Sequence, residues 1–438
     1  MSGRMFWLFA VAVLASPIAR GDDWPQWMGP KRDNVWREEG ILEKFPKGGP
    51  TIVWRTPIAA GYSGPAVANG KVYVTDRVLG KGAANPENPF DTKNKIASTE
   101  RVLCLDAKSG KEIWKHEYDC AYQISYPAGP RCTPVVQDGN VYTLGAMGNI
   151  FCLNAETGKV VWSKDLAKEY NTKPALWGYA AHPLIDGKKL ITLAGGEGSH
   201  VVALDKDTGK ELWKAGQQPQ QGYSPVLITE AGGKRQMIVA GVKSIYSLDP
   251  ETGEQYWTTP FVVDNGCVVM TPVRAGEHLF VGGYNGKSTV LKLTADKPGV
   301  EVLWQNKKGS GMSPINVQPF LQDGVLYGYD DSGNMYAVEI PSGKRLWDGV
   351  GPVGSGPKGS ETAFMVKQGD RFFFFAETGD LVIGKLTAKG YEEIDRAKVL
   401  EQTNVAFGRK VVWCAPAYSD KKAFIRNDKE IICVELAK

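Results

Sequence analysis

The sequence predicts an all-β protein, an eight-bladed β-propeller whose blades are four-stranded antiparallel sheets. One observation is a phrase, Leu-Asp-x-x-(Ser/Thr)-Gly-Lys-Glu-x-Trp, which occurs at 105–114 and 204–213 and in variant form at 153–162, 248–257 and 338–347. A second is a proline-ending dipeptide that opens each repeat. Recurrence every ~40–50 residues is typical of stacked supersecondary units such as propeller blades.

The composition agrees with one globular repeat domain. The chain has 438 residues, of which 42% are hydrophobic and 23% charged, and its 51 Gly and 26 Pro supply many turns between short strands. A closed array of repeats holds this length as one unit because each repeat contacts only its neighbours. The formal net charge is only +4, without a dense basic cluster, so we expect no nucleic-acid partner.

Each repeat shows the same order of parts. A small or polar residue before proline opens the innermost strand, a Gly turn leads to the second strand, the Asp/Thr-Gly-Lys turn follows the third, and the Trp strand ends the blade. The opening dipeptides are Gly64-Pro65, Thr133-Pro134, His182-Pro183, Ser224-Pro225, Thr271-Pro272, Gln318-Pro319 and Ala415-Pro416.

The number of repeats predicts how the ring closes. Full repeats end at Trp114, Trp162, Trp213, Trp257, Trp304 and Trp347. A seventh, degenerate repeat spans about 361–401, and three strands remain near 411–418, 422–426 and 430–436. Residues 51–56 supply the missing outer strand. The eighth blade is therefore expected to combine both ends of the chain, which removes exposed sheet edges.

The N-terminal residues predict export. Arg4, an apolar run at 5–15 and small residues before Asp22 indicate a signal peptide over 1–21, because the run is too short to span a bilayer. Residues 22–50 then form an N-terminal arm and 51–438 the propeller. We expect an exported monomer, periplasmic or secreted, without a transmembrane segment.

Two features leave alternatives open. A polar insertion at 77–101 interrupts the first blade, and it either caps the channel mouth or docks a partner, or it is tolerated slack. Among the seven cysteines, Cys104, Cys152 and Cys433 occupy a small-residue slot of the repeat and are expected in the core. Cys120 and Cys132 share one connecting segment, where they either pair or stay free.

The repeated phrase resembles the repeat of the PQQ-like, or quinoprotein-type, β-propeller superfamily. The resemblance covers nearly all of the predicted mature chain, and the opening residues 24–34 also look like the arm of exported bacterial PQQ-like repeat proteins. It implies an eight-bladed ring. Some members of that superfamily are PQQ-dependent dehydrogenases, whereas others, such as the BamB-like subgroup, are scaffolds without a cofactor.

The cofactor ligands separate these two groups. The resemblance implies that an enzyme would clamp PQQ with a disulfide between adjacent cysteines and would hold Ca²⁺ through Glu, Asn and Asp. This sequence has no adjacent cysteines, and it has no Cys-x-x-Cys-His for haem. The chain therefore resembles the BamB-like, non-enzymatic subgroup, although its first cysteine, Cys104, lies too far from the signal for a lipid anchor there.

A candidate binding site follows from the repeat alignment. Residues at and just before the proline dipeptides are expected to ring one mouth of the central channel, where propellers hold ligands. The candidates are Arg131, Trp177, Tyr179, His182, Gln221, Tyr223, Asn265, Gln318, Glu361 and Arg409. No residue is assigned a catalytic role, and no spacing predicts a metal site.

The sequence thus favours an exported propeller that works as a non-catalytic binding or assembly scaffold in the cell envelope. Its expected partner is an envelope protein or a small ligand at the channel mouth, and no cofactor is predicted. The alternative is a PQQ- and calcium-dependent dehydrogenase of alcohols or sugars with atypical cofactor ligands.

Overall fold

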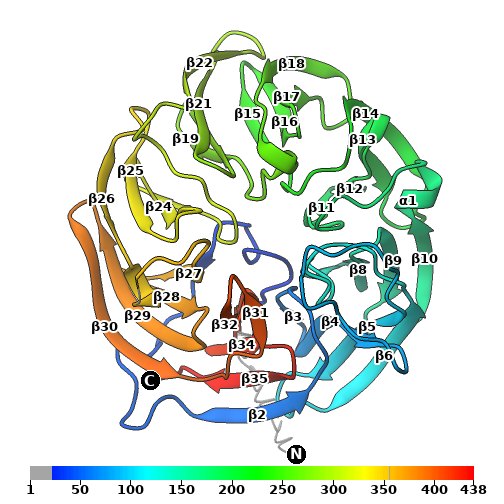
Figure 1. The fold of residues 1–438 in the computed structure, drawn as a ribbon, viewed down its shortest axis with the longest axis vertical. Helices are drawn as coiled ribbons and strands as arrows, with labels where there is room; N and C mark the ends of the chain where they lie inside the picture. The colour runs from blue at the N-terminus through cyan, green and yellow to red at the C-terminus, as the bar shows by residue number, and fades with distance from the viewer. Residues whose placement is uncertain (1–21, 355) are drawn as a thin grey trace, which may run out of the picture.

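The computed structural model, which describes residues 22–354 and 356–438, is a ring of eight blades around a central channel (Figure 1). The predicted signal peptide, 1–21, lies outside the described residues. Each blade runs outward from the channel as four antiparallel strands. The predicted all-β, eight-bladed fold is confirmed, and the helices of the described residues are short: α1 (Leu166–Glu169) and the single turns η1 (Asp264–Gly266) and η2 (Gly351–Val353).

The first four blades follow one another along the chain. Blade 1 is β3 (Ala66–Ala68), β4 (Lys71–Leu79), β5 (Ser98–Asp106) and β6 (Glu112–Asp119), and blade 2 is β7 (Val135–Gln137), β8 (Asn140–Leu144), β9 (Asn149–Asn154) and β10 (Val160–Asp165). Blade 3 is β11 (Leu184–Asp186), β12 (Lys189–Leu193), β13 (Gly196–Asp205) and β14 (Glu211–Gln218). Blade 4 is β15 (Leu227–Ala231), β16 (Lys234–Ala240), β17 (Ser244–Leu248) and β18 (Gln255–Pro260).

The next three blades repeat this order. Blade 5 is β19 (Val273–Ala275), β20 (His278–Gly283), β21 (Lys287–Leu293) and β22 (Val300–Gln305), and blade 6 is β23 (Phe320–Gln322), β24 (Val325–Tyr329), β25 (Met335–Glu339) and β26 (Arg345–Gly349). Blade 7 is β27 (Ala363–Gln368), β28 (Arg371–Ala376), β29 (Asp380–Thr387) and β30 (Gly390–Lys398). A separate hairpin follows, β31 (Asn404–Ala406) and β32 (Arg409–Val411).

Both ends of the chain build blade 8, as predicted. Its inner strands are β33 (Ala417–Ser419), β34 (Lys422–Arg426) and β35 (Glu430–Glu435), and its outer strand is β2 (Ile52–Pro57), which pairs antiparallel with β35 (Figure 1). The sequence did not predict β1 (Val35–Trp36), which the N-terminal arm adds to blade 7 parallel to β27. The arm therefore ties blade 7 to the closing blade.

The repeated Trp and Gly form the joint between neighbouring blades. The indole N–H of Trp114 on β6 donates to the carbonyl of Ala155 in the next blade at 3.0 Å, and its ring covers the turn glycine Gly158. A Cβ on Gly158 would lie 2.5 Å from that ring, and the glycine also has φ +69°. Only glycine meets both conditions without strain.

The Asp of the phrase stabilises the same type of turn, as the repeat at 204–213 shows. Asp205 Oδ1 accepts from the Thr208 backbone N–H and hydroxyl, both at 2.8 Å, and the Thr208 hydroxyl bond is the main cause that lowers the pKa of Asp205. Such side-chain bonds to nearby backbone are the usual reason for Asp and Thr at turns. The predicted structural role of the phrase is therefore confirmed at this turn.

Two open questions of the sequence have structural answers. The insertion is shorter than 77–101, because β4 and β5 pair as far as Leu79 and Ser98, which leaves residues 80–97 as the loop. All seven cysteines are free and buried, and Cys120 is not paired with Cys132. Cys104, Cys152 and Cys433 lie in the core, as predicted.

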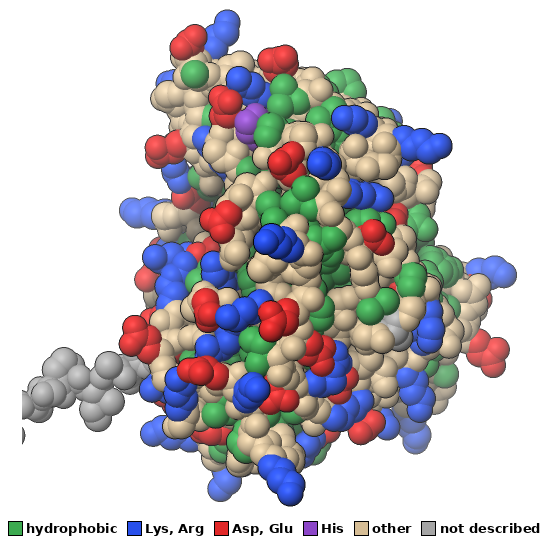
Figure 2. Space-filling model, turned by 90° about the vertical axis from the view of Figure 1, so that its left-hand side faces the viewer, with side chains coloured by type: hydrophobic (Ala, Val, Ile, Leu, Met, Phe, Trp, Pro, Cys, Tyr) green, Lys and Arg blue, Asp and Glu red, His purple; other side chains and the backbone are tan. Residues whose placement is uncertain are grey.

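The side of the ring carries both signs of charge. Figure 2 shows Lys and Arg interspersed with Asp and Glu over this face, with no area of one sign. Many of these groups form ion pairs between exposed side chains, which contribute little to stability. Over the described part of the chain, the longest apolar helical stretch falls short of what a membrane crossing requires.

Candidate functional site

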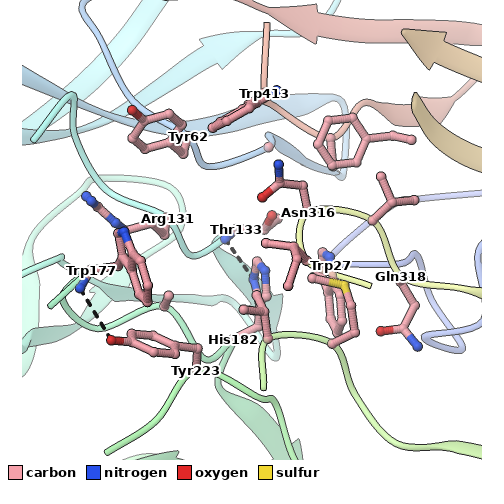
Figure 3. A pocket seen from close by; sticks show the side chains of 18 of the residues that line it. Trp27, Tyr62, Arg131, Thr133, Trp177, His182, Tyr223, Asn316, Gln318 and Trp413 are labelled. Carbon is pink, nitrogen blue, oxygen red and sulfur yellow. Dashed lines mark hydrogen bonds between the residues drawn. The ribbon is translucent and has the colours of Figure 1, made fainter. Parts of the chain in front are cut away.

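A cavity of about 350 Å³ lies in the channel, where the inner strands begin. Its wall is mainly apolar and rich in aromatic side chains, which come from the N-terminal arm and from loops of several blades (Figure 3). Large aromatic members of the wall are Trp27, Tyr62, Tyr126, Trp177, Tyr223 and Trp413. The volume lies at the lower end of the range for small-molecule sites, about 300–1,000 Å³.

The N-terminal arm supplies one side of this cavity. Trp24 exchanges two backbone hydrogen bonds with Val67 of β3, and further along the arm the Asn34 carbonyl accepts from Lys367 N–H on β27. The arm thus crosses the centre of the ring from blade 1 to blade 7 (Figure 1). Because Trp24, Trp27, Met28 and Asn34 all line the cavity, the arm turns an open channel into a pocket.

His182 is part of the wall and is held from both sides. The Thr133 backbone N–H donates to His182 Nδ1 at 3.0 Å, and the imidazole stacks on Trp27 with centroids 4.5 Å apart and planes 3° apart. Burial, with a smaller contribution from the charge of Arg32, lowers the pKa of His182 to about 3. The imidazole is therefore neutral at pH 7, and because Nδ1 accepts, Nε2 carries the proton.

Arg131 is the charged member of the wall. Its guanidinium donates to the carbonyls of Ser125 at 3.0 Å and Tyr126 at 2.8 Å, and also to that of Gly129. It lies over the Tyr62 ring, 5.2 Å from the centroid. No ion pair within 4.0 Å joins this guanidinium to a carboxylate of the described chain. Burial raises the pKa of Glu100, and the positive charge of Arg131 opposes this shift, so that buried carboxyl lies within electrostatic range behind the wall. The guanidinium itself lines the cavity, where no acidic side chain accompanies it.

The wall lacks acidic side chains. No Asp or Glu lines the cavity, and in residues 22–354 and 356–438 no three His, Cys, Asp or Glu side chains gather as metal ligands do. Two of the four amide side chains of the wall are already engaged: Gln318 both accepts from and donates to the Thr271 backbone, and Asn316 donates to Ser360 and Thr362. The arrangement suits binding of an apolar body.

Of the ten predicted site residues, six line the cavity. They are Arg131, Trp177, His182, Tyr223, Asn265 and Gln318. Trp177 and Tyr223 also contact each other, since the Tyr223 hydroxyl accepts from the Trp177 backbone N–H at 3.4 Å (Figure 3). These six come from several different blades and meet because each lies one to seven residues before an opening proline, in the segment that enters an innermost strand.

The other four predicted residues lie behind the wall. The Tyr179 hydroxyl donates to the Ala194 carbonyl at 3.2 Å, and the Gln221 carbonyl contacts His200 Nε2 at 3.0 Å. Glu361 is 2% exposed and accepts from the Lys358 backbone N–H. All three are buried and none of them lines the cavity.

The fourth predicted residue, Arg409, does not line the cavity but shares the Glu377 carboxylate with Trp413, which does. Its guanidinium binds buried Glu377, with Nε–Oε1 at 2.6 Å and Nη2–Oε2 at 3.1 Å, and the Trp413 indole donates to the same carboxylate at 2.9 Å. Arg409 therefore fixes the hairpin that carries it and the orientation of Trp413. The sequence predicted its place near the mouth but not this ion pair.

Sequence reasoning missed Trp27, Tyr62, Asn316 and Trp413. Three of them share a position in the repeat that could have been used. In six of the blades, the third residue before the opening proline lines the cavity. These residues are Tyr62, Arg131, Ala180, Val269, Asn316 and Trp413. Trp27 had no such signal because it lies in the arm, outside the repeats.

Aromatic side chains from three loops surround the mouth. Phe90 of the insertion packs edge-on against Tyr126 at 5.3 Å, and Phe407 of the β31–β32 turn lies 6.1 Å from Trp413. Phe90 and Phe407 are 48% and 51% exposed. The Pro89 carbonyl accepts from the Tyr126 backbone N–H at 2.9 Å, which anchors the insertion here. The insertion thus reaches the rim of the cavity through Phe90.

Comparison with known proteins now identifies the family. A family described as "Outer membrane protein assembly factor BamB" matches residues 98–348 and 241–437, which together span more than half of the chain. The chain belongs to this family. The PQQ-like resemblance predicted from the repeats is therefore confirmed.

Individual relatives in and around the family are of two kinds. A quinoprotein ethanol dehydrogenase of Pseudomonas putida is 31% identical over 206 residues, 41% of this chain and 33% of the relative, so the chain matches only a third of that protein's length. BamB of Moraxella catarrhalis has a similar structure, with a TM-score of 0.55, 16% identity and coverage of 88% of this chain and 97% of that one.

A quinohemoprotein alcohol dehydrogenase of Comamonas testosteroni is similar in structure to the same degree. Its TM-score is 0.60 at 13% identity, covering 94% of this chain and 80% of that one. At these identities the structural matches establish the fold alone. Both kinds of relative share the ring, and the function of this chain has to be argued from its own cavity.

Proposed function

We propose that this chain is an exported, non-catalytic binding and assembly scaffold of the cell envelope, which holds its partner or ligand at the channel mouth. The observation that carries the proposal is the wall of the cavity, which is aromatic, contains one cation and has no acidic side chain. General acid–base catalysis needs a titratable pair within reach of the substrate. His182 in the described wall is neutral and already bonded to Thr133, and burial raises the pKa of Tyr62, Tyr126, Tyr223 and Cys267, so these groups stay protonated rather than act as bases.

The dehydrogenase relatives make a quinoprotein enzyme the second candidate. Calcium binding needs six to eight oxygen ligands, usually including carboxylates. Glu361, the acidic residue predicted for the ring, is turned behind the wall, and the cysteines of the described chain are all free. The residues present therefore do not fit PQQ held with Ca²⁺ and a cysteine clamp. No resident cofactor is part of the proposal.

Membership of the BamB family supports an envelope location and a protein partner. The exposed aromatic side chains at the mouth support the same reading, because clustered exposed aromatics are typical of interaction sites. Phe90 and Phe407 stand on two separate loops, the insertion and the β31–β32 hairpin. A partner that covers the mouth would bury both.

Site-specific photo-crosslinking in the native host tests this proposal. A photoreactive amino acid at position 407 is expected to give one discrete adduct with an envelope protein. The matched control places it at Val161, which is similarly exposed, 48%, but lies on the outer strand β10. Equal labelling at both positions, or none at 407, would contradict the scaffold.

A dye-reduction assay separates the two candidates. The purified chain is titrated with PQQ and Ca²⁺ and then assayed with alcohols and sugars. We expect no saturable binding that depends on Ca²⁺ and no turnover. Turnover that requires both PQQ and Ca²⁺ would make the channel an active site and would overturn the non-catalytic proposal.

A further inference from the structure

The chemistry of the cavity wall narrows the kind of ligand that it accepts. The wall supplies hydrogen-bond donors and a positive charge but no carboxylate. Arg131 has five N–H groups, and three backbone carbonyls accept from it. No acceptor among the described residues takes the remaining N–H groups, which leaves donors for a ligand in the cavity.

The backbone contacts of Arg131 also fix its position. Three carbonyls from residues 125–129 hold the guanidinium over Tyr62, on the side of the cavity where Trp177 lies (Figure 3). A guanidinium that is already ordered loses little entropy when it binds an anion. Its planar fork matches a carboxylate, and such charge-assisted bonds are roughly twice as strong as neutral ones.

The remainder of the cavity suits a flat apolar body. Trp27, Trp177, Tyr223 and Trp413 present ring surfaces from different loops, and the arm covers one side. His182 adds a neutral ring that stacks on Trp27 and carries its proton on Nε2. Stacking on several rings favours planar ligands, and about 350 Å³ admits a small molecule or one side chain.

We propose, building on the proposed binding function, that the channel cavity binds a small monoanionic ligand with a planar apolar body, whose carboxylate meets the guanidinium of Arg131. The ligand binds without a metal ion, because the charge that it brings balances Arg131 directly. The body stacks among the aromatic side chains on the arm side of the mouth.

The same observations argue against the other ligand classes. An aromatic pocket also suits organic cations, but the positive charge of Arg131 in the wall repels them and the wall has no acid to attract them. A sugar needs acceptors and donors for many hydroxyls. Here Gln318 is bonded to Thr271 through both ends of its amide, and the Asn316 N–H₂ donates to blade 7. Asn34 and Asn265 are the remaining amides of the wall, and the wall has no carboxylate to accept from sugar hydroxyls.

Calorimetric titration with three matched probes tests the proposal. Indole-3-acetate, indole-3-acetamide and tryptamine share one flat ring and differ in charge, being anionic, neutral and cationic at pH 7.5. We expect indole-3-acetate to bind at least tenfold more tightly than the amide, and tryptamine to bind most weakly. Raising the salt concentration reduces the preference for the anion, because screening weakens the contact with Arg131.

Variants of the full chain assign the effect to one side chain. Arg131→Gln is expected to remove the preference for the anion, whereas Arg131→Lys retains part of it because the charge remains. Arg55→Gln is the control. Arg55 lies on the outer strand β2, away from the channel, and pairs there with Glu430 of β35. Near-ultraviolet circular dichroism checks that each variant is folded.

Each outcome bears on the proposal. Equal affinity for the acetate and the amide, an unchanged preference in a folded Arg131→Gln variant, or no binding of any probe would overturn it. The scaffold function is tested separately, because crosslinking at position 407 uses no probe. A positive crosslink together with equal probe affinities would refute the anion specificity and leave the scaffold standing.

Discussion

Replacing Glu377 by Gln is expected to destabilise the protein and loosen the cavity wall. Glu377 is 2% exposed and receives two hydrogen bonds from Arg409 and one from Trp413. Gln has nearly the same shape but no charge. The substitution therefore leaves the Arg409 guanidinium, whose side chain is 12% exposed, without its counter-ion.

The size of the effect follows from this burial. Removing one partner of a buried ion pair costs about 3–5 kcal/mol, because the other charge stays in a poorly solvated place. Gln keeps an oxygen for the Trp413 indole, so the loss is expected at the lower end, about 3 kcal/mol of the free energy of unfolding. The double variant Glu377→Gln with Arg409→Met removes both charges, keeps an acceptor for the Trp413 indole and is expected to recover most of this loss.

Urea denaturation followed by far-ultraviolet circular dichroism measures these free energies. Asp370→Asn is the control, because Asp370 pairs with Lys385 at 2.9 Å while 71% of its side chain is exposed, and such surface pairs contribute about 0–1 kcal/mol. A Glu377→Gln variant within about 1 kcal/mol of the wild type, or a double variant less stable than the single one, would refute the reasoning, since both contradict a buried pair worth several kcal/mol.

Two further predictions concern the joints and the core. Gly158→Ala is expected to lower the free energy of unfolding, measured by thermal denaturation, by about 2–4 kcal/mol, because its Cβ would overlap the Trp114 ring. Gly139→Ala is the control: Gly139 has φ +78° but open space around its Cβ position, so the expected loss is only about 1 kcal/mol. His200 is fully buried, and burial lowers its pKa to about 4. In the unfolded chain His200 binds a proton near pH 6.5, whereas in the folded protein it stays neutral until about pH 4. The contribution of neutral His200 to the free energy of unfolding is therefore fully present above pH 6.5 and is lost as the pH falls below that value. The loss reaches roughly 2 kcal/mol at pH 5 and should disappear from the pH profile of His200→Gln; an unchanged profile would contradict this.

The repeats were sufficient to predict the ring because each one encodes a local unit. The Asp-x-x-Thr-Gly turn and its Trp lie within ten residues of one another. The Asp bonds within its own turn, and the Trp contacts the adjacent blade. The site was predicted only in part. Glu361 and Arg409 stand at ring positions, but whether a polar side chain faces the cavity depends on partners distant in sequence, such as Glu377 for Arg409.

The contribution of the N-terminal arm was not predictable from the repeat pattern. Trp27 stacks on His182, which lies 155 positions further along the chain, and no periodicity connects the two. The arm is short and irregular, so hydrophobic patterning does not indicate where it goes. Only the fold of the whole ring shows that its aromatic side chains reach the cavity.

The joint that closes the ring is chemically the same as the internal ones. Trp54 on β2 donates to the Ala107 carbonyl at 3.0 Å and covers Gly110, just as Trp114 does with Ala155 and Gly158 one blade further on. The seam between the last and first blades thus uses the same Trp–Gly contact as the other joints, and Trp24 of the arm adds contacts with both blades. A circularly permuted gene, opened at another blade and joined at the natural termini, would encode the same set of joints, so the order of the blades around the ring matters more to this fold than the point where the polypeptide starts.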